Sequence, residues 1–222
     1  LRAGVALLGL RIALGDIAGL GGQTLVLVLS CVALTLALGS LVGRLFGLPK
    51  GFSMLAASAT AICGASAAMA VSQVLPKSPE TERQTAYVVA VVATLSTLAM
   101  LAYPAVAHLA GLPPQAAAVY LGDSIHDVAQ VAGAGYSISP QVGDLAVTVK
   151  LVRVSLLALV VAAVAFSFAG AAREAKGPGR ALLLPGFVIA FFALAAIRST
   201  GLVPASVLPA ATFASNVLIG AG

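Results

Sequence analysis

The chain has 222 residues, of which 60% are apolar and only 9% carry a charge, whereas roughly 25% of the residues of an ordinary soluble domain are charged. With 23 Gly, 11 Pro, two Cys and no Trp, it is neither a disordered segment, a collagen repeat nor a disulfide scaffold. This composition predicts a polytopic membrane protein. The net charge of +5 then indicates loops facing an anionic cytoplasmic leaflet, and we expect no nucleic-acid partner.

Charged residues divide the apolar sequence into candidate spans, because a span needs about 20 apolar residues to cross roughly 30 Å of hydrocarbon. In chain order the expected spans are 1–14, 17–43, 51–76, 85–110, one starting near 115, 141–170, 181–203 and 205–222. We therefore expect an all-α, polytopic transmembrane helix bundle with about eight spans, forming a single domain over 1–222. Because both ends lie inside apolar stretches, we also expect the domain to continue beyond them.

Basic residues near the span ends indicate the orientation of the bundle. Alternating crossings place one group of them on one face: Arg44, Lys50, Arg173, Lys176 and Arg180. They place a second group on the opposite face: Arg11, Lys77, Arg83 and Arg198. The first face has more of these basic residues and is therefore expected to be cytoplasmic.

The span at 51–76 has small, helix-weakening residues at its centre, Ala61-Ile62-Cys63-Gly64-Ala65-Ser66-Ala67. Hydrocarbon tolerates non-helical backbone only where protein or a water-filled cavity satisfies its polar groups. A break here would direct the free N–H groups of a half-helix N-terminus at the membrane centre and favour an anion. Alternatively, the same small residues allow close helix packing.

A second polar segment contains Asp123, Ser124, His126, Asp127 and Gln130 directly after Gly122. On a continuous helix both acids and the amide lie within about 60° of one another, and the imidazole widens that face to roughly 100°. Exposing them to lipid would cost several kcal/mol, so we expect the face to line the bundle interior or a wet cavity. A second broken helix is therefore expected here.

The two segments share a G-x-S pattern, Gly64-Ala65-Ser66 and Gly122-Asp123-Ser124, at an offset of 58 residues (from 64 to 122). By counting crossings, both would run in the same direction, whereas inverted repeats require opposite directions. Either one segment is re-entrant or the two are not repeat equivalents.

Two cations, Lys150 and Arg153, lie within the span at 141–170. One interpretation is that both side chains extend to the membrane interface. The other is that they point inward, where they could pair with Asp123 or Asp127 or attract an anion. The planar Arg guanidinium suits bidentate contacts with carboxylate, sulfate or sulfonate oxygens.

Three blocks, ICGASA at 62–67, GDSIHDVAQVAGAG at 122–135 and VKLVRV at 149–154, together resemble the sulfate exporter family of bacterial inner-membrane proteins. The resemblance implies about ten or eleven helices, distantly similar to the cation:proton antiporter and anion transporter superfamily, with broken helices at the membrane centre. Carried over to this chain, it implies substrate- and ion-binding residues in both breaks and on the cationic helix. They are Cys63, Gly64, Ala65, Ser66, Asp123, Ser124, His126, Asp127, Gln130, Lys150 and Arg153.

The expected function is secondary transport of a small oxyanion, sulfate or sulfonate, coupled to a proton or sodium ion by alternating access. Asp127, tuned by His126 and Lys150, would exchange the proton, while the half-helix end at Gly64–Ser66 and Arg153 would hold the anion. Membrane lipid, the anion and the coupling ion are the expected partners, and a homo-oligomer is compatible with the sequence. No cofactor, metal site or enzymatic activity is expected.

Two alternatives belong to other functional classes. Ser66 and His126 on different helices would suit an intramembrane hydrolase, because a serine nucleophile needs a nearby base. A passive channel or a non-catalytic membrane subunit is the other alternative.

Overall fold

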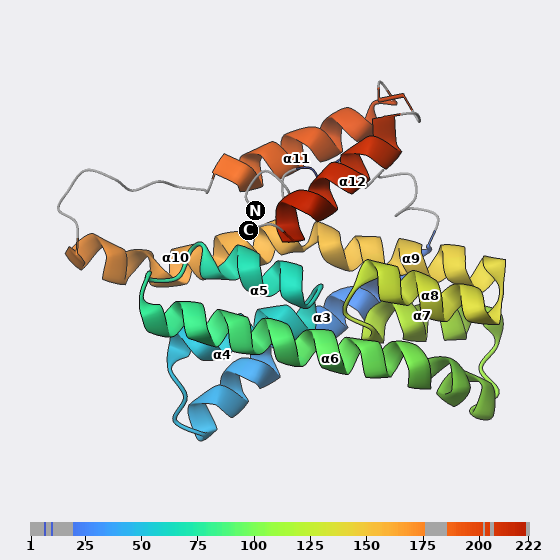
Figure 1. The fold of residues 1–222 in the computed structure, drawn as a ribbon, viewed down its shortest axis with the longest axis horizontal. Coiled ribbons are helices and arrows are strands. Elements are labelled where there is room, and N and C mark those ends of the chain that lie inside the picture. The colour runs from blue at the N-terminus through green and yellow to red at the C-terminus, as the bar shows by residue number, and fades with distance from the viewer. Residues whose placement is uncertain are drawn as a thin grey trace.

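A computed structural model describes residues 7, 10, 20–175, 186–201, 203–204 and 207–220 of the chain. Every regular element in this part is a helix (Figure 1), which confirms the all-α expectation. The span expected at 1–14 lies outside the described residues apart from Leu7 and Leu10, and Arg11, Lys176 and Arg180 also lie outside them.

Three helices of the described part are long and apolar enough to cross a membrane. They are α3 (Gly22–Leu45), α6 (Pro79–Leu109) and the continuous stretch Pro140–Phe168, which comprises α9 (Pro140–Ser155) and most of α10 (Leu157–Ala175). Serine caps begin two of them: Ser78 Oγ accepts from Thr81 N at 3.1 Å, and Ser139 Oγ accepts from Val142 N at 3.2 Å. A proline follows each cap, where its missing N–H removes no helical hydrogen bond.

Helices α4 (Lys50–Ala61) and α5 (Ala65–Ser72) form a hairpin that enters and leaves at one end of the bundle (Figure 1). A Cβ added to Gly51, at the start of α4, would lie 3.9 Å from Leu75, just beyond the end of α5. The 12 residues of α4 are about 18 Å long, roughly half the hydrocarbon thickness. The single crossing expected at 51–76 is therefore wrong, because an apolar stretch of this length also accommodates two half-length arms.

Helices α7 (Pro114–Ser124) and α8 (Val128–Ile138) form a second hairpin at the opposite end. The start of α7 and the end of α8 line one pocket of about 370 Å³, to which Pro114 and Ile138 both contribute. That pocket is also lined by His108, in the last turn of α6, whereas α6 begins beside the first hairpin. The two hairpins therefore enter from opposite ends, with α6 running between them (Figure 1).

This arrangement resolves the repeat question that counting crossings left open. Both segments are re-entrant, and their entry directions are opposite, as inverted repeats require. The non-helical tips of the two hairpins are Ile62-Cys63-Gly64 and Ile125-His126-Asp127, at an offset of 63 residues (from 62 to 125). The G-x-S motifs do not correspond, because Gly64–Ser66 begins α5 whereas Gly122–Ser124 ends α7.

Helices α11 (Gly186–Ser199) and α12 (Val207–Gly220) occupy the segments where the spans at 181–203 and 205–222 were expected. Neither is among the three membrane-crossing helices of the described residues. The spans expected at 51–76 and near 115 are hairpins in this structure, so the count of about eight spans is not confirmed, while the crossings at 181–203 and 205–222 stay predictions.

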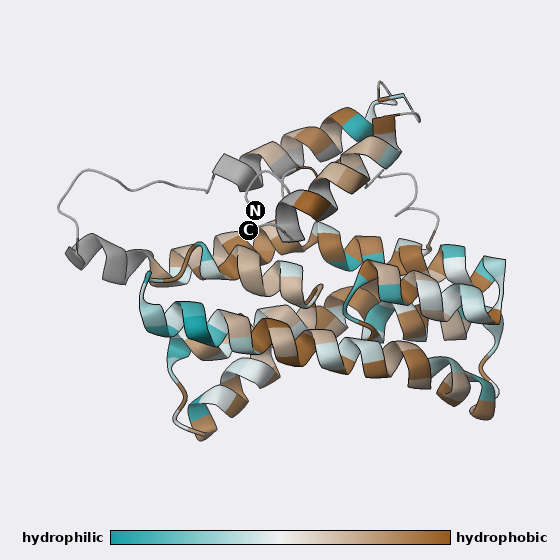
Figure 2. Cartoon of the chain, viewed as in Figure 1, coloured by the Kyte–Doolittle hydropathy of each residue, from teal (hydrophilic) through white to brown (hydrophobic). Residues whose placement is uncertain are grey.

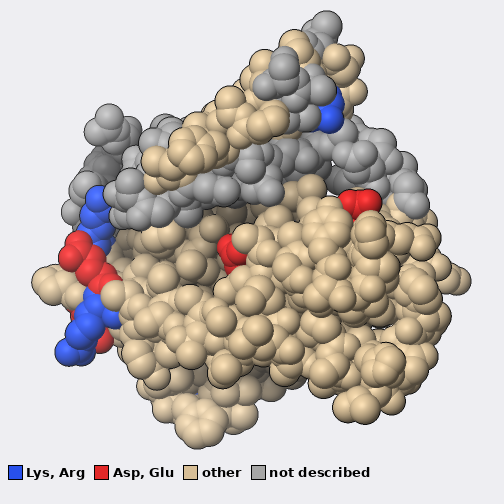
Figure 3. Space-filling model, turned by 45° about the vertical axis from the view of Figure 1, so that its right-hand side comes forward, with Lys and Arg blue, Asp and Glu red and all other residues tan. Residues whose placement is uncertain are grey.

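Basic side chains within residues 20–168 are distributed unevenly along the bundle. Among the Lys and Arg residues of this range, four lie where the first hairpin enters, at Arg44, Lys50, Lys77 and Arg83, and two lie inside, at Lys150 and Arg153. The opposite end has no Lys or Arg within this range, although His108 lies there. Figure 3 shows charged residues gathered at one edge of an otherwise largely uncharged face, and Figure 2 shows hydrophilic residues where α6 begins. The hairpin thus moves Lys77 and Arg83 to the same end as Arg44 and Lys50, and the positive-inside rule favours that end as cytoplasmic.

Glycines bring the hairpins close to the crossing helices. A Cβ added to Gly122 of α7 would lie 2.4 Å from the Ala146 carbonyl of α9, and one added to Gly135 of α8 would lie 2.7 Å from the Gly143 Cα. On the other side, a Cβ on Gly39 of α3 would lie 2.7 Å from the Ala57 Cβ of α4. Such close approaches hold membrane helices together by van der Waals packing.

Candidate functional site at the hairpin tips

The tips of the two hairpins meet inside the bundle. Gly64 adopts a φ of +65°, and a Cβ added to it would lie 3.1 Å from the His126 Cβ and 3.6 Å from Val92 Cγ2. Ile62 and Ile125, one from each tip, are both fully buried. The helix is interrupted between Ala61 and Ala65, as the small residues there predicted.

The middle of α6 supports the second tip. The Ser96 hydroxyl, which is almost fully buried, accepts hydrogen bonds from the backbone N–H groups of His126 at 3.1 Å and Asp127 at 3.3 Å. The Gln130 amide donates to Thr97 Oγ1 at 2.9 Å. Because Ser96 and Thr97 lie near the midpoint of α6, the tips lie near the centre of the membrane.

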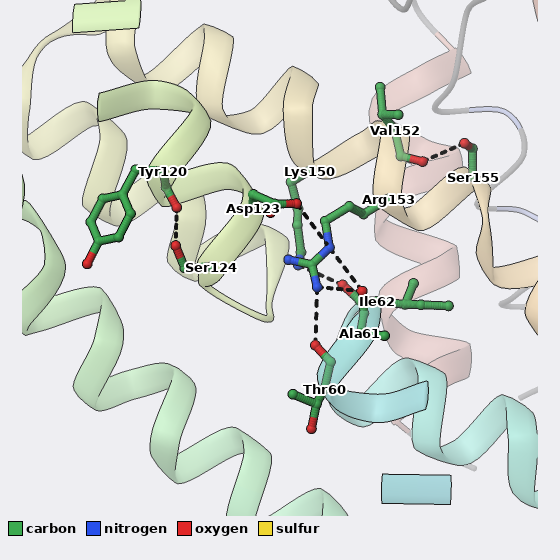
Figure 4. Close-up of polar contacts among 10 residues, drawn as sticks. All are labelled: Thr60, Ala61, Ile62, Tyr120, Asp123, Ser124, Lys150, Val152, Arg153 and Ser155. Atoms are coloured by element: carbon green, nitrogen blue, oxygen red, sulfur yellow. Dashed lines mark hydrogen bonds and ion pairs between the residues drawn. The ribbon is translucent and has the colours of Figure 1, made fainter. Parts of the chain in front are cut away.

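Lys150 and Arg153 bind the C-terminal end of α4 (Figure 4). Lys150 Nζ donates to the Ile62 carbonyl at 2.7 Å, and Arg153 Nε donates to the Ala61 carbonyl at 3.0 Å. Arg153 Nη2 donates to the Thr60 carbonyl at 3.1 Å and also to that of Ala61. The last carbonyls of a helix lack intrahelical partners and carry partial negative charge, so the two cations compensate the interrupted end.

Both cations point into the bundle. Lys150 is 0% exposed and Arg153 is 4% exposed, which excludes extension of either side chain to the interface. Arg153 Nε also lies 3.6 Å from Asp123 Oδ1, so a carboxylate of the second hairpin faces the guanidinium. Of the two interpretations of Lys150 and Arg153, the one in which both side chains point inward is therefore correct.

The acids of the second hairpin do not form one continuous helical stripe. Helix α7 ends at Ser124, whose hydroxyl donates to the Tyr120 carbonyl, and α8 begins only after Asp127. Asp127 is exposed and is the N-cap of α8, where its Oδ1 accepts from Ala129 N at 2.8 Å and from Gln130 N at 3.4 Å. Aspartate favours this cap position over a helix interior, which explains why the expected stripe is divided.

Several polar atoms at the tips are buried without a hydrogen-bond partner in the described part of the chain. They are Asp123 Oδ1, His126 Nδ1, Gln130 Oε1 and Arg153 Nη1. The N-terminus of α5 also lies here, and its cap residue, Gly64, offers no side-chain hydrogen bond. Both an unpaired guanidinium N–H and the free N–H groups of an uncapped helix N-terminus can donate hydrogen bonds to an anion.

The remaining predicted residues lie around this centre. Cys63 is buried in the first tip, while Ala65 and Ser66 form the first turn of α5 and are partly exposed. Among the described hydrogen bonds, none joins Ser66 to His126, whose Nδ1 has no partner. The serine and base of the hydrolase alternative are therefore on facing tips but are not engaged with each other.

Sequence reasoning missed three contributors to this centre. Ser96 and Thr97 hold the second tip, and Cys31 of α3 lies close enough to Asp123 to interact with it. A detectable signal existed for two of them, because Ser96 and Thr97 are adjacent hydroxyl residues at the middle of an apolar span. No comparable feature of the sequence indicated that Cys31 lies at this centre.

Fold and site together define a multi-pass helical membrane protein with two opposed re-entrant hairpins. The chain belongs to the family described as Conserved hypothetical protein 698, whose model matches residues 1–222.

Curated relatives support this assignment. UPF0324 membrane protein TauZ of Paracoccus denitrificans is 49% identical over 210 residues, covering 93% of this chain and 62% of the relative. UPF0324 membrane protein RB0971 of Rhizobium meliloti is 48% identical over 205 residues (92% and 59%), and UPF0324 membrane protein CT0845 of Chlorobaculum tepidum is 46% identical over 217 residues (98% and 60%).

The chain spans about three fifths of the length of these curated relatives, and no solved structure matches it. The relatives' names and the apolar helices identify a multi-pass bacterial membrane protein, in agreement with the expected inner-membrane location. The family description mentions neither sulfate nor export, so membership of the family does not identify the substrate.

Proposed function

We propose that the chain forms the substrate-binding part of a secondary transporter for a small oxyanion, sulfate or sulfonate. The observation that carries the proposal is the meeting of two opposed hairpin tips beside Lys150 and Arg153, two buried cations at the centre of the bundle. Ionisable groups at membrane depth are costly and usually mark a translocation path. The protein would then be a carrier and not an enzyme.

The charges at the tips favour an anion. Lys150 and Arg153 are buried, and the partly buried Asp123 pairs with Arg153. Asp127 is exposed and is occupied as a helix cap. The N-terminus of α5 adds a partial positive charge that no side chain caps. An oxyanion with several acceptor oxygens would satisfy Arg153 Nη1 and the first N–H groups of α5 together.

The opposed hairpins favour a carrier over an open channel. In this structure the unpaired polar atoms of the tips are buried and do not line an open pore. A hairpin entering from each end can shield the centre from that end, and movement of one tip at a time would give alternating access.

Coupling would use the acids of the second hairpin. Asp127 is exposed and could exchange a proton or bind sodium, whereas Asp123 faces Arg153. His126 belongs to the second tip and lies against Gly64 of the first, so its charge would act on both tips. A coupling ion at this hairpin would link its movement to occupation of the anion site.

The test is uptake of radiolabelled sulfate and methanesulfonate by liposomes containing the full-length protein. We expect saturable uptake that depends on a proton or sodium gradient and falls at least tenfold in Arg153→Gln. Arg83→Gln, which removes an exposed arginine paired with Glu80, is the matched control and should transport normally. Non-saturable uptake would support a channel, and normal uptake by Arg153→Gln would refute the proposed anion site.

A further inference from the structure

We propose that Asp123 is a resident carboxylate that occupies Arg153 in the empty carrier and must be displaced by the incoming anion. This inference rests on the proposed function and assigns a specificity role to one residue of that site. Asp123 would set the affinity for substrate by competing with it for the guanidinium.

The first support is the incomplete pairing of the two groups. Asp123 Oδ1 lies 3.6 Å from Arg153 Nε, beyond the range of a charge-assisted hydrogen bond. Asp123 Oδ1 and Arg153 Nη1 both lack hydrogen-bond partners in the described part of the chain although both are buried. The carboxylate therefore neutralises the guanidinium without forming the bidentate contact that would hold it in place.

The second support is the difference in how the two partners are anchored. Arg153 is held by carbonyls of Thr60 and Ala61 through Nε and Nη2, which leaves Nη1 as its free donor. Asp123 lies in the last turn of α7, next to the tip of the hairpin (Figure 4). Movement of that tip would withdraw the carboxylate while the guanidinium stays in place.

The third support is electrostatic. Two anions cannot share one buried guanidinium at low cost, because like charges at close range in a weakly screened interior repel strongly. Lys150 is already engaged with the Ile62 carbonyl and does not offer Asp123 a hydrogen bond in the described structure. A substrate oxyanion at Arg153 and Asp123 retained there would therefore compete for the same guanidinium.

The experiment is equilibrium binding of radiolabelled sulfate to the detergent-solubilised full-length protein. Asp123→Asn removes the competing charge at nearly constant size, and we expect the Kd to fall by about tenfold, the change that one modest ionic contact produces. Asp123→Glu keeps the charge and should not tighten binding. Asp144→Asn is the matched control, because Asp144 is an acid of α9 that accepts from Tyr136 Oη at 2.6 Å away from the tips.

The outcomes separate the two proposals. If the wild-type protein binds neither sulfate nor methanesulfonate, the proposed function fails. If the wild-type protein binds sulfate and Arg153→Gln does not, but Asp123→Asn binds no more tightly than wild type, the role of Asp123 alone is refuted. Asp123→Ser, measured on protein that elutes as a single species, replaces Asp123→Asn if the asparagine variant does not fold, and the same tightening is expected.

Discussion

Gly64 and His126 lie against each other at the centre of the molecule, where a Cβ on Gly64 would come within 3.1 Å of the His126 Cβ. The first residue is the cap of α5 and the second precedes the cap of α8. Each is supplied by a hairpin that enters from a different end of the bundle. Their contact therefore couples the positions of the two tips, and the spacing between the tips is sensitive to a single methyl group.

Replacement of Gly64 by Ala tests this contact. The backbone of Gly64, with φ +65° and ψ −119°, costs an L-residue about 1–3 kcal/mol, and overpacking against His126 adds about 1–3 kcal/mol. Gly47→Ala is the matched control, because Gly47 has the same φ of +65° and no atom within 4 Å of its added Cβ. Unfolding in detergent should show a larger loss of stability for Gly64→Ala, and equal losses would contradict the contact.

Lys150→Met tests the role of the lysine at the end of α4. The substitution keeps the length of the side chain but leaves the buried Ile62 carbonyl without its donor, which should lower the free energy of unfolding by about 1–3 kcal/mol. Lys77→Met, at an exposed lysine, should change it by no more than about 0.5 kcal/mol. A stabilised Lys150→Met protein would show that burial of the charge outweighs the carbonyl contact.

Asp127→Asn separates helix capping from ion coupling. Asparagine caps a helix about as well as aspartate, so the asparagine variant should keep wild-type thermal stability while losing the dependence of anion flux on the proton or sodium gradient. Asp127→Ala should lose about 1 kcal/mol of stability as well, because the bonds from Ala129 N and Gln130 N disappear. Gradient-dependent flux in Asp127→Asn would exclude Asp127 as the coupling residue.

The hairpin topology can be tested by labelling single cysteines with a membrane-impermeant thiol reagent in sealed vesicles. Cysteines replacing Phe46 and Lys77, which are both exposed, should react from the same side because the first hairpin does not cross the membrane. A cysteine replacing Leu109, at the other end of α6, should react from the opposite side. Labelling of positions 46 and 77 from different sides would restore the single crossing at 51–76.

The sequence predicted the interruption near Cys63 and Gly64 because small residues at mid-span weaken a helix in hydrocarbon. It also placed Lys150 and Arg153 on a span long enough to bury them, and their partners are backbone carbonyls that no residue pattern reveals. The return of the chain after the break was not predicted. Apolar length and charge spacing are the same for one crossing and for two half-length arms. The tertiary structure distinguishes them, because Gly51 at the start of α4 lies beside Leu75 after the end of α5.

The arrangement of the second hairpin also could not be predicted from sequence alone. A helical period places Asp123 and Asp127 on one face only if the helix is continuous, and the Asp127 cap interrupts it. Asp123 consequently faces Arg153 while Asp127 is exposed. Ser96 contributes through a long-range contact with the backbone of the second tip, and such contacts follow from tertiary packing and not from local sequence.

The most direct measurement is a structure of the full-length protein with selenate, a sulfate analogue whose selenium scatters X-rays anomalously. We expect an anomalous peak between Arg153 and the N-terminus of α5, within hydrogen-bond distance of the guanidinium, with Asp123 withdrawn from Arg153. A peak confined to the basic residues at the end of the bundle, or none at saturating selenate, would contradict it.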